Sequence, residues 1–319
     1  MGDRGYRSIR GDLRQLRSAA HLPDLMADHF HAGLVDDLAR GRGVVMLLGA
    51  RDTGKSTFAR HLVGAAIGNG TTAALVDADI DQTTVGPPAC VGLRLFSSGD
   101  DPTAAIEPDR LHFVGAIGPE RVVLQQVVAT AALTSHARGS ADLVVVDTTG
   151  VISGVAGETL KYHKMELCRP EVVVAFQRGA EAEPLAGMLR RFFGAEVVLV
   201  AVDPEVRPSD PERRREHRAA AFAAALGPPL QKWRVRDTVF APTLPDGLDL
   251  TRLDGILVGL QDGTGTCLGL GILEHDDGGV RVMTRHGEGM RGLRLGTLRI
   301  DPETFDTRRV RLGELMFGV

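Results

Sequence analysis

The chain contains six short apolar runs, and amphipathic segments separate most of them. Runs of this length, rich in valine and leucine, are typical of buried strands. We expect strands at 44–48, 73–76, 111–115, 143–146, 172–176 and 197–202. Helical periodicity follows the first strand and recurs at 121–136, 158–168 and 183–193. Strands that alternate with helices predict an α/β fold with a mainly parallel sheet and helices on both faces.

The pattern changes after residue 228. Short β-like runs at 256–260, 267–273, 280–284 and 293–300 are separated by Asp-Gly, Gly-Gly and Gly-Glu-Gly turns. This alternation predicts a small β-rich domain at 229–319, behind a main α/β domain at 41–228. Before it, residues 1–40 form an arm and an amphipathic helix, expected at 22–38. The arginines at positions 7, 10, 14 and 17 favour a solvated tail over a nucleic-acid contact.

Composition narrows the functional classes. The 319 residues are 43% hydrophobic and 24% charged, and the net charge of −4 excludes a basic coat over the whole surface. A polynucleotide would therefore have to meet a local basic patch. The three cysteines, Cys90, Cys168 and Cys267, lie far apart, which argues against a zinc site or a disulfide framework. No apolar run reaches the roughly 20 residues of a membrane span, so we expect a cytoplasmic protein without a membrane partner.

Residues 49–57, Gly-Ala-Arg-Asp-Thr-Gly-Lys-Ser-Thr, directly follow the first strand and fit the pattern G-x-x-x-x-G-K-[ST]. Backbone amides in such a loop face a polyphosphate, Lys55 can reach the β- and γ-phosphates, and the Ser56 hydroxyl can ligate Mg²⁺. Strand, loop and helix follow in the required order. The residues expected to bind the nucleotide are Gly49, Asp52, Thr53, Gly54, Lys55, Ser56 and Thr57.

Carboxylates follow two of the expected strands. Asp77 and Asp79 end the second strand, where both can serve one site only if the chain turns. Asp147 ends the apolar run at 143–146, as in a Walker B strand whose carboxylate holds the Mg²⁺ shell. The sequence therefore predicts an Mg²⁺ site formed by Ser56, Asp77 and Asp147.

A helix expected at 209–226 carries a cluster of arginines. Ser209-Asp210-Pro211 supplies an N-cap and an early proline. Arg214 and Arg218 lie one turn apart on one face, an arrangement that lets two guanidiniums close on a phosphate. A solvated helix surface is the alternative interpretation.

Four segments together resemble the P-loop polynucleotide 5′-hydroxyl kinases, the family of the mRNA cleavage-factor RNA kinase and the nucleolar pre-ribosomal RNA kinases. They are the P-loop at 49–57, Asp-Ala-Asp-Ile-Asp-Gln-Thr-Thr-Val-Gly-Pro-Pro at 77–88, Asp-Thr-Thr-Gly at 147–150 and Arg-Arg-Glu-His-Arg at 214–218.

The resemblance implies that ATP, with Mg²⁺, donates a phosphoryl group to a 5′-hydroxyl of RNA or DNA. It implies that Lys55 binds phosphates, that Asp79 orients or deprotonates the hydroxyl, and that Arg214 and Arg218 form a lid that neutralises the moving γ-phosphoryl. It also makes 113–119 the clasp around that phosphate. Substrate contacts are implied for Gln82, Gly115 and Thr149.

The chain departs from the family pattern at three places. Asp81 stands where a glycine usually precedes the glutamine, residues 116–118 of the clasp lack a hydroxyl, and Val151 replaces a base-stacking tryptophan. Two other functions stay open: a P-loop ATPase that acts as a switch or scaffold in nucleic-acid processing, and a kinase of a small metabolite. The sequence leaves RNA versus DNA preference, protein partners and the choice of base between Asp77 and Asp79 undecided.

Overall fold

The computed structural model describes residues 31–103, 106–276 and 279–318, which form two compact units. The first unit comprises the chain up to Asp79, Leu93–Asp109 and Val123–Pro208, and the second comprises Ile80–Gly92, Arg110–Val122 and Ser209–Val319. The arm at 1–20 and the first part of the helix expected at 22–38 lie outside the described residues. The domains expected from the sequence are continuous stretches of the chain, whereas each of these units combines several stretches that contact one another. The expected domain boundaries therefore stay a prediction.

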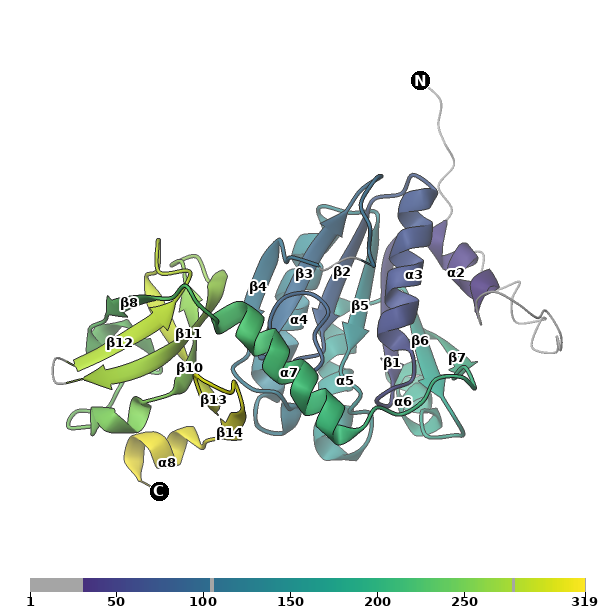
Figure 1. Ribbon diagram of the computed structural model, residues 1–319. Coiled ribbons are helices and arrows are strands. Elements are labelled where there is room, and N and C mark those ends of the chain that lie inside the picture. The colour runs from purple at the N-terminus through teal and green to yellow at the C-terminus, as the bar shows by residue number, and fades with distance from the viewer. Residues whose placement is uncertain (1–30, 104–105, 277–278, 319) are drawn as a thin grey trace. The chain divides into compact units, whose positions relative to one another are not determined.

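The first unit is built on a sheet in the order β3-β2-β5-β1-β6-β7 (Figure 1). The pairs β2–β5, β5–β1, β1–β6 and β6–β7 are all parallel. The strands are β1 (Gly43–Gly49), β2 (Ala73–Ala78), β3 (Cys90–Phe96), β5 (Leu143–Thr148), β6 (Val172–Gln177) and β7 (Glu196–Ala201). The four central strands β2, β5, β1 and β6 are almost fully buried, which explains their uninterrupted apolar runs.

Helices cover both faces of this sheet, as predicted. They are α2 (Ala32–Ala39), α3 (Lys55–Gly68), α4 (Val123–Arg138), α5 (Gly154–Cys168) and α6 (Glu183–Phe193). Helix α3 packs on β1, β2 and β5, with α2 against it, whereas α4 packs on β2 and β5 and contacts α5. Figure 1 shows α3 on the near side of these strands and α4 on the far side. The chain passes from β1 through α3 to β2 in one direction along the sheet, and from β5 through α5 to β6 in the other. Because such crossovers are right-handed, opposite directions put the helices on opposite faces.

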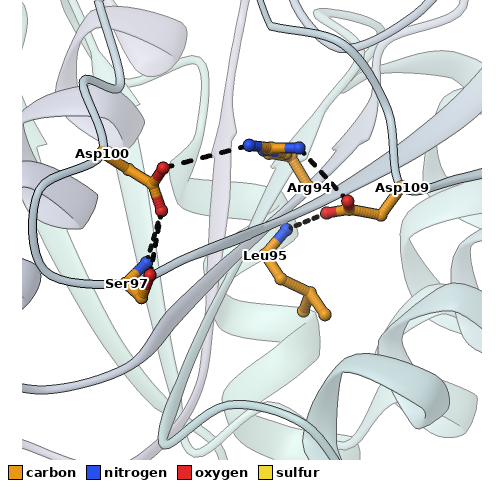
Figure 2. Close-up of polar contacts among 5 residues, drawn as sticks. All are labelled: Arg94, Leu95, Ser97, Asp100 and Asp109. Atoms are coloured by element: carbon orange, nitrogen blue, oxygen red, sulfur yellow. Dashed lines mark hydrogen bonds and ion pairs between the residues drawn. The ribbon is translucent and has the colours of Figure 1, made fainter.

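The strict alternation of strands and helices predicted from the sequence is wrong in one region. Strands β2, β3 and β4 (Arg110–Phe113) follow one another without an intervening helix, and the sequence did not indicate β3. Beyond β3, Asp109 accepts hydrogen bonds from the Leu95 amide (2.7 Å) and the Arg94 guanidinium (3.2 Å), and Arg94 also lies 4.0 Å from Asp100 (Figure 2). Arg94 is thus shared by two carboxylates and is not a candidate for phosphate binding.

The second unit is mainly antiparallel. Its strands follow the order β14-β13-β10-β11-β4, β12 pairs with β11 and β8, and β9 pairs with β13. They are β8 (Gln231–Arg234), β9 (Phe240–Ala241), β10 (Ile256–Gln261), β11 (Cys267–Asp276), β12 (Gly279–Thr284), β13 (Gly292–Ile300) and β14 (Thr307–Arg309). The unit also holds α7 (Pro211–Leu226), α8 (Leu312–Phe317) and three short 3₁₀ helices, Pro119–Arg121, Asp237–Val239 and Leu250–Leu253. The four predicted β runs of this region are confirmed, whereas β8, β9, β14 and α8 were not predicted.

The arginine helix begins where the sequence predicts. Asp210 is the N-cap of α7, and its carboxylate accepts a hydrogen bond from the Glu212 amide at 3.1 Å. Pro211 occupies the first turn, where a proline costs no hydrogen bond. The buried residues of α7, Phe222 and Leu226, lie in its second half, so the arginines of its first half stay outside the core.

Candidate nucleotide and phosphoryl-transfer site

The P-loop lies between β1 and α3, and its backbone uses left-handed conformations. Gly54 is the N-cap of α3 with φ +83°, and Asp52 has φ +54°. A side chain at Gly49 would meet the Phe176 carbonyl oxygen and the Thr53 hydroxyl at 2.9 Å each, so only glycine fits there. The loop is therefore wound so that the N-terminus of α3 opens at the end of β1, the arrangement that binds phosphates.

Lys55 folds back across this loop. Its ammonium donates hydrogen bonds to the Ala50 carbonyl at 2.6 Å and to the Thr53 hydroxyl at 3.2 Å. The side chain is buried, and this burial lowers the pKa of Lys55, while Asp147, Asp79 and Asp52 oppose the shift. Two of the carboxylates that the sequence singled out, Asp79 and Asp147, therefore act electrostatically on the lysine.

Strand register places two of the predicted site carboxylates, Asp77 and Asp147, side by side. Asp77 of β2 pairs with Asp147 of β5, at the ends of neighbouring parallel strands. The Ser56 hydroxyl donates to Asp147 Oδ2 at 2.6 Å, which joins the P-loop to β5. The Asp79 amide donates to Asp77 Oδ1 at 3.0 Å, so the chain turns directly after β2, as the shared use of both carboxylates requires. Helix α3, β2 and β5 therefore bring Ser56, Asp77 and Asp147 together, and the turn after β2 places Asp79 next to Asp77.

The residues predicted to hold Mg²⁺ fit a metal ion. Asp147 Oδ1 is buried and has no hydrogen-bond partner among the described residues, and burial raises the pKa of Asp147. A buried oxygen of this kind costs free energy unless a cation or a donor meets it. The described part of the chain holds no group of three or more His, Cys, Asp or Glu side chains able to hold a metal alone. A P-loop Mg²⁺, which takes few protein ligands and several phosphate and water oxygens, needs no such group.

Helix α5 adds two buried lysines that the sequence analysis did not single out. Lys161 donates to the Thr148 hydroxyl at 2.8 Å and to the Thr149 carbonyl at 2.7 Å, so it fixes the end of β5. Lys164 is fully buried, its ammonium has no hydrogen-bond partner among the described residues, and burial lowers its pKa to about 8. The sequence offered one indication of these two residues: lysine is rare in this chain, which has only four.

The segment after β5 lies against the P-loop. A side chain at Gly150 would meet the Arg51 amide nitrogen at 2.6 Å, so this position must be glycine. Thr149 is buried, and its hydroxyl accepts from the Val151 amide at 3.2 Å. Arg178, which follows β6, also holds the P-loop, because it donates to the Asp52 carbonyl at 2.5 Å. Arg178 is another loop contact that no sequence pattern indicated.

A cavity of about 170 Å³ borders the P-loop within the first unit. Thr53, Gly54 and Thr57 form its polar side, and the rings of His31, Phe58 and Phe176 form an aromatic wall. The ring centroids of Phe58 and Phe176 are 5.3 Å apart in an edge-to-face arrangement, and the His31 ring lies 6.3 and 6.0 Å from them. This wall was missed because its residues come from three distant parts of the chain.

Gln82 and the two arginines predicted to form a lid, Arg214 and Arg218, lie in the second unit. Arg218 Nη1 donates to Asp81 Oδ1 at 2.6 Å, and both side chains are largely buried, with 17% and 15% exposed. Gln82 Nε2 donates to the Arg214 carbonyl at 3.2 Å, and Arg214 Nη1 donates to the Ser209 carbonyl at 2.7 Å. The acidic segment after Asp79 is therefore tied to the first half of α7.

Gly115 has a structural reason to be glycine. Its φ is +83°, and a side chain would meet the Gly296 Cα at 2.9 Å. Its amide donates to the Ala89 carbonyl at 2.9 Å, and its carbonyl accepts from the Thr297 amide at 2.7 Å and the Thr297 hydroxyl at 3.0 Å. Both backbone groups of Gly115 are therefore bonded within the protein, so the predicted substrate contact of Gly115 stays a prediction.

The predicted residues thus form two groups. Lys55, Ser56, Asp77, Asp79, Asp147 and Thr149 lie together in the first unit with the rest of the P-loop, and Gln82, Gly115, Arg214 and Arg218 lie in the second. The chain crosses directly from one group to the other between Asp79 and Ile80.

A strand that leads through a glycine-rich loop into a helix, with a buried lysine and a serine bonded to an aspartate of the adjacent strand, defines a P-loop nucleotide-binding protein. Residues 49–224, more than half of the chain, match the family described as mRNA cleavage and polyadenylation factor CLP1 P-loop. The chain belongs to this family. In the described residues, no helix is long and apolar enough to cross a membrane.

Curated relatives cover most of the chain. A polyribonucleotide 5′-hydroxyl-kinase of Thermococcus kodakarensis is 27% identical over 85% of this chain and 92% of its own length. Another, from Methanocaldococcus jannaschii, is 26% identical over 81% of this chain and 87% of its own. A chain in the solved Clp1p–Pcf11p complex is similar in fold, with a TM-score of 0.64, 14% identity and coverage of 84% of this chain and 78% of that one.

Proposed function

We propose that this chain is an ATP-dependent polynucleotide 5′-hydroxyl kinase, which transfers the γ-phosphoryl group of ATP to the 5′-hydroxyl of RNA or DNA. The observation that carries the proposal is that Asp79 and Asp147 act on the buried Lys55 of the P-loop, with Asp77 beside Asp147 on the neighbouring strand. Membership of the CLP1 P-loop family and relatives named as 5′-hydroxyl kinases over most of the chain support the same reaction.

The P-loop holds the ATP phosphates. Backbone amides at the start of α3 donate to the phosphate oxygens, and Lys55 exchanges its bond to the Ala50 carbonyl for the β- and γ-phosphates. The cavity beside the loop receives the nucleobase, because an aromatic wall of His31, Phe58 and Phe176 suits the face or edge of a purine. When Mg²⁺ is bound, held by Ser56, Asp77 and Asp147, it neutralises charge on the phosphates.

Asp79 is the residue that orients the acceptor hydroxyl and takes its proton. Asp77 is fully buried within β2 opposite Asp147, which suits a metal-side ligand. Asp79 lies past the strand end and is only partly buried, so an incoming hydroxyl can reach it. The order of burial along the turn thus supports a division of roles between the two carboxylates.

The lid arginines act on the transferring group. Arg214 and Arg218 bring positive charge to the γ-phosphoryl as it loosens from ADP, and this charge stabilises the transition state more than the bound substrates. Gln82 and Thr149 assist at the acceptor side.

The test is transfer of label. The protein is incubated with Mg²⁺, γ-labelled ATP and matched RNA and DNA oligonucleotides that carry either a 5′-hydroxyl or a 5′-phosphate. Label is expected on the 5′-hydroxyl oligonucleotides alone, and Lys55→Ala serves as the inactive control. ATP hydrolysis without label on any oligonucleotide would favour a switch ATPase. A parallel incubation offers nucleosides and sugars, and label on one of these but on no oligonucleotide would favour a metabolite kinase.

A further inference from the structure

A cavity with a volume of about 690 Å³ lies wholly within the second unit. Its walls come from the clasp segment, from β13 and β14 and from the start of α8. Six arginines line it, against two glutamates: Arg121, Arg252, Arg299, Arg308, Arg309 and Arg311, with Glu120 and Glu314. In a chain with a net charge of −4, this is a strong local concentration of positive charge.

Much of this charge is not neutralised by carboxylates. The side chains of Arg121 and Arg308 make no hydrogen bond or ion pair with any residue in the described ranges. Arg299 Nη2 donates to the Arg252 carbonyl at 2.8 Å, and Arg252 donates to the Glu314 carbonyl, so these two bond to neutral groups. Carbonyl oxygens fix a guanidinium in place but leave its net charge intact.

The two carboxylates engage their arginines at the exposed rim. Glu120 lies 3.9 Å from Arg309, with both side chains more than half exposed, and Glu314 accepts from Arg311 at 2.6 Å, again at an exposed position. Exposed pairs of this kind contribute little to stability because water screens them, so an incoming anion can displace them easily.

The cavity shares a wall with the clasp. Ala116, Ile117 and Gly118 line it, and a side chain at Gly118 would meet Glu120 Oε2 at 2.6 Å and Arg309 Nη2 at 2.9 Å. The guanidinium of Arg309 therefore lies directly against the clasp backbone. Thr297 of β13, which also lines the cavity, bonds to the Gly115 carbonyl through both its amide and its hydroxyl.

We propose that this arginine cavity binds phosphodiester groups of the acceptor polynucleotide, next to the 5′-terminal nucleotide that the clasp receives. The proposal rests on the proposed kinase function and names the subsite that gives it a polymer substrate. Guanidinium forks match phosphate oxygens in pairs, and a cavity of this volume holds more than one phosphate. None of the residues lining it in the described structure is aromatic. Without a stacking surface, the cavity binds the backbone and does not select bases.

Arg308 and Arg309 are suited to the test because both are exposed on the short strand β14. The double variant Arg308→Ala/Arg309→Ala removes two charges from the cavity. The matched control is Arg234→Ala/Arg236→Ala, which removes the same charge from exposed positions of the same unit, at and just after β8, outside the cavity. Circular dichroism and thermal melting check that both variants fold.

Binding is measured by fluorescence anisotropy with 20-nucleotide RNA and DNA strands that carry a 5′-hydroxyl and a 3′ dye, over a series of KCl concentrations. We expect the cavity variant to raise Kd at least ten-fold. The slope of log K against log salt should fall by about 1.4, that is, about 0.7 for each lost contact to a single strand. The control should stay within two-fold of wild type. Equal binding by wild type, control and cavity variant would overturn the proposal, as would the absence of binding by wild type.

A kinase assay separates failure of the subsite from failure of the proposed function. We expect the KM for the 20-mer, relative to the KM for a nucleoside 3′-monophosphate, to rise at least ten-fold in the cavity variant. If wild type transfers phosphate and this ratio does not change, the subsite is wrong and the kinase stands. If wild type transfers no phosphate but the cavity variant loses oligonucleotide binding, the kinase is wrong and the cavity remains a polynucleotide site. Binding of inorganic phosphate by wild type and by the cavity variant is measured by calorimetry. If the cavity variant loses phosphate binding but keeps its affinity for the oligonucleotide, the cavity is only an anion pocket and the proposal is overturned.

Discussion

The contact between Arg218 and Asp81 gives the sharpest prediction about the proposed lid. Arg218 can stabilise the transferring phosphoryl group only if its charge is available, and in the structure Nη1 donates to Asp81 Oδ1 at 2.6 Å. Both side chains are largely buried, so solvent screens this pair less than a surface pair. We therefore expect Asp81 to restrain the arginine and Asp81→Asn to increase the rate of phosphoryl transfer.

The magnitude follows from the kind of contact. A hydrogen bond to a charged group contributes about 1.5–3 kcal/mol, and each 1.4 kcal/mol removed from the barrier is a factor of ten in rate. Full release of Arg218 would then accelerate the chemical step by roughly 10- to 100-fold. Asparagine can still accept a hydrogen bond, so the lower end, about ten-fold, is expected for Asp81→Asn.

The assay is the single-turnover rate with saturating ATP and a 5′-hydroxyl 20-mer, which avoids a limit set by product release. Asp306→Asn is the matched control: it releases Arg215 on the same helix, which bonds to Asp306 at 2.9 Å from Nε and lies outside the proposed lid. Asp306 acts on Arg218 only through its charge and makes no hydrogen bond to it in the described residues, so the rate of Asp306→Asn should change far less than that of Asp81→Asn. In an Arg218→Ala background, itself expected to be about 10²-fold slower, Asp81→Asn should have no further effect. A slower Asp81→Asn enzyme, or an acceleration that persists without Arg218, would refute the restraint.

Three further predictions concern the first unit. Lys55→Ala should abolish phosphoryl transfer with an unchanged circular dichroism spectrum, because the lysine faces the loop and not the apolar core; near-normal transfer would contradict the P-loop role. Asp79→Asn should slow transfer by orders of magnitude with ATP affinity largely kept, whereas the same result for Asp77→Asn alone would reverse the two roles. Lys164→Met should stabilise the protein by roughly 3 kcal/mol below pH 8, because the folded pKa of about 8 lies below the unfolded 10.5. The wild type should regain this stability as pH rises from 8 to 10.5, and a difference in urea unfolding that is constant over this range would disprove the shift.

Much of the fold could be predicted from the sequence, because apolar runs and turn residues act locally. The strands at 44–48, 143–146 and 172–176 are confirmed almost to the residue as β1, β5 and β6. These strands are buried on both faces, so their composition alone distinguishes them from the amphipathic helices between them. The P-loop is equally local, since a glycine at each required position and a strand before it are both visible in the chain.

What the sequence could not determine depends on residues brought together from distant parts of the chain. Strand β3 was missed because its segment follows two prolines and has no helix after it, so no local pattern distinguished it from a loop. The register that sets Asp77 beside Asp147 depends on the pairing of β2 with β5, about 70 residues apart. Lys161 and Lys164 read as ordinary charged helix positions, and only packing of α5 beneath the site buries them.

The arginine cavity shows the same division. Its arginines are visible in the sequence but are spread from Arg121 to Arg311, among others that pair with carboxylates on the surface. An arginine's partner is a tertiary property: Arg94 is neutralised by Asp109 and Asp100, whereas Arg308 is left without a carboxylate in the described structure. The sequence by itself determined the fold class and the phosphate-binding loop, because both depend on patterns of residues that are close together in the chain. The tertiary structure alone decided which charges remain available to a substrate, because neutralisation depends on distances between elements that the chain order does not contain.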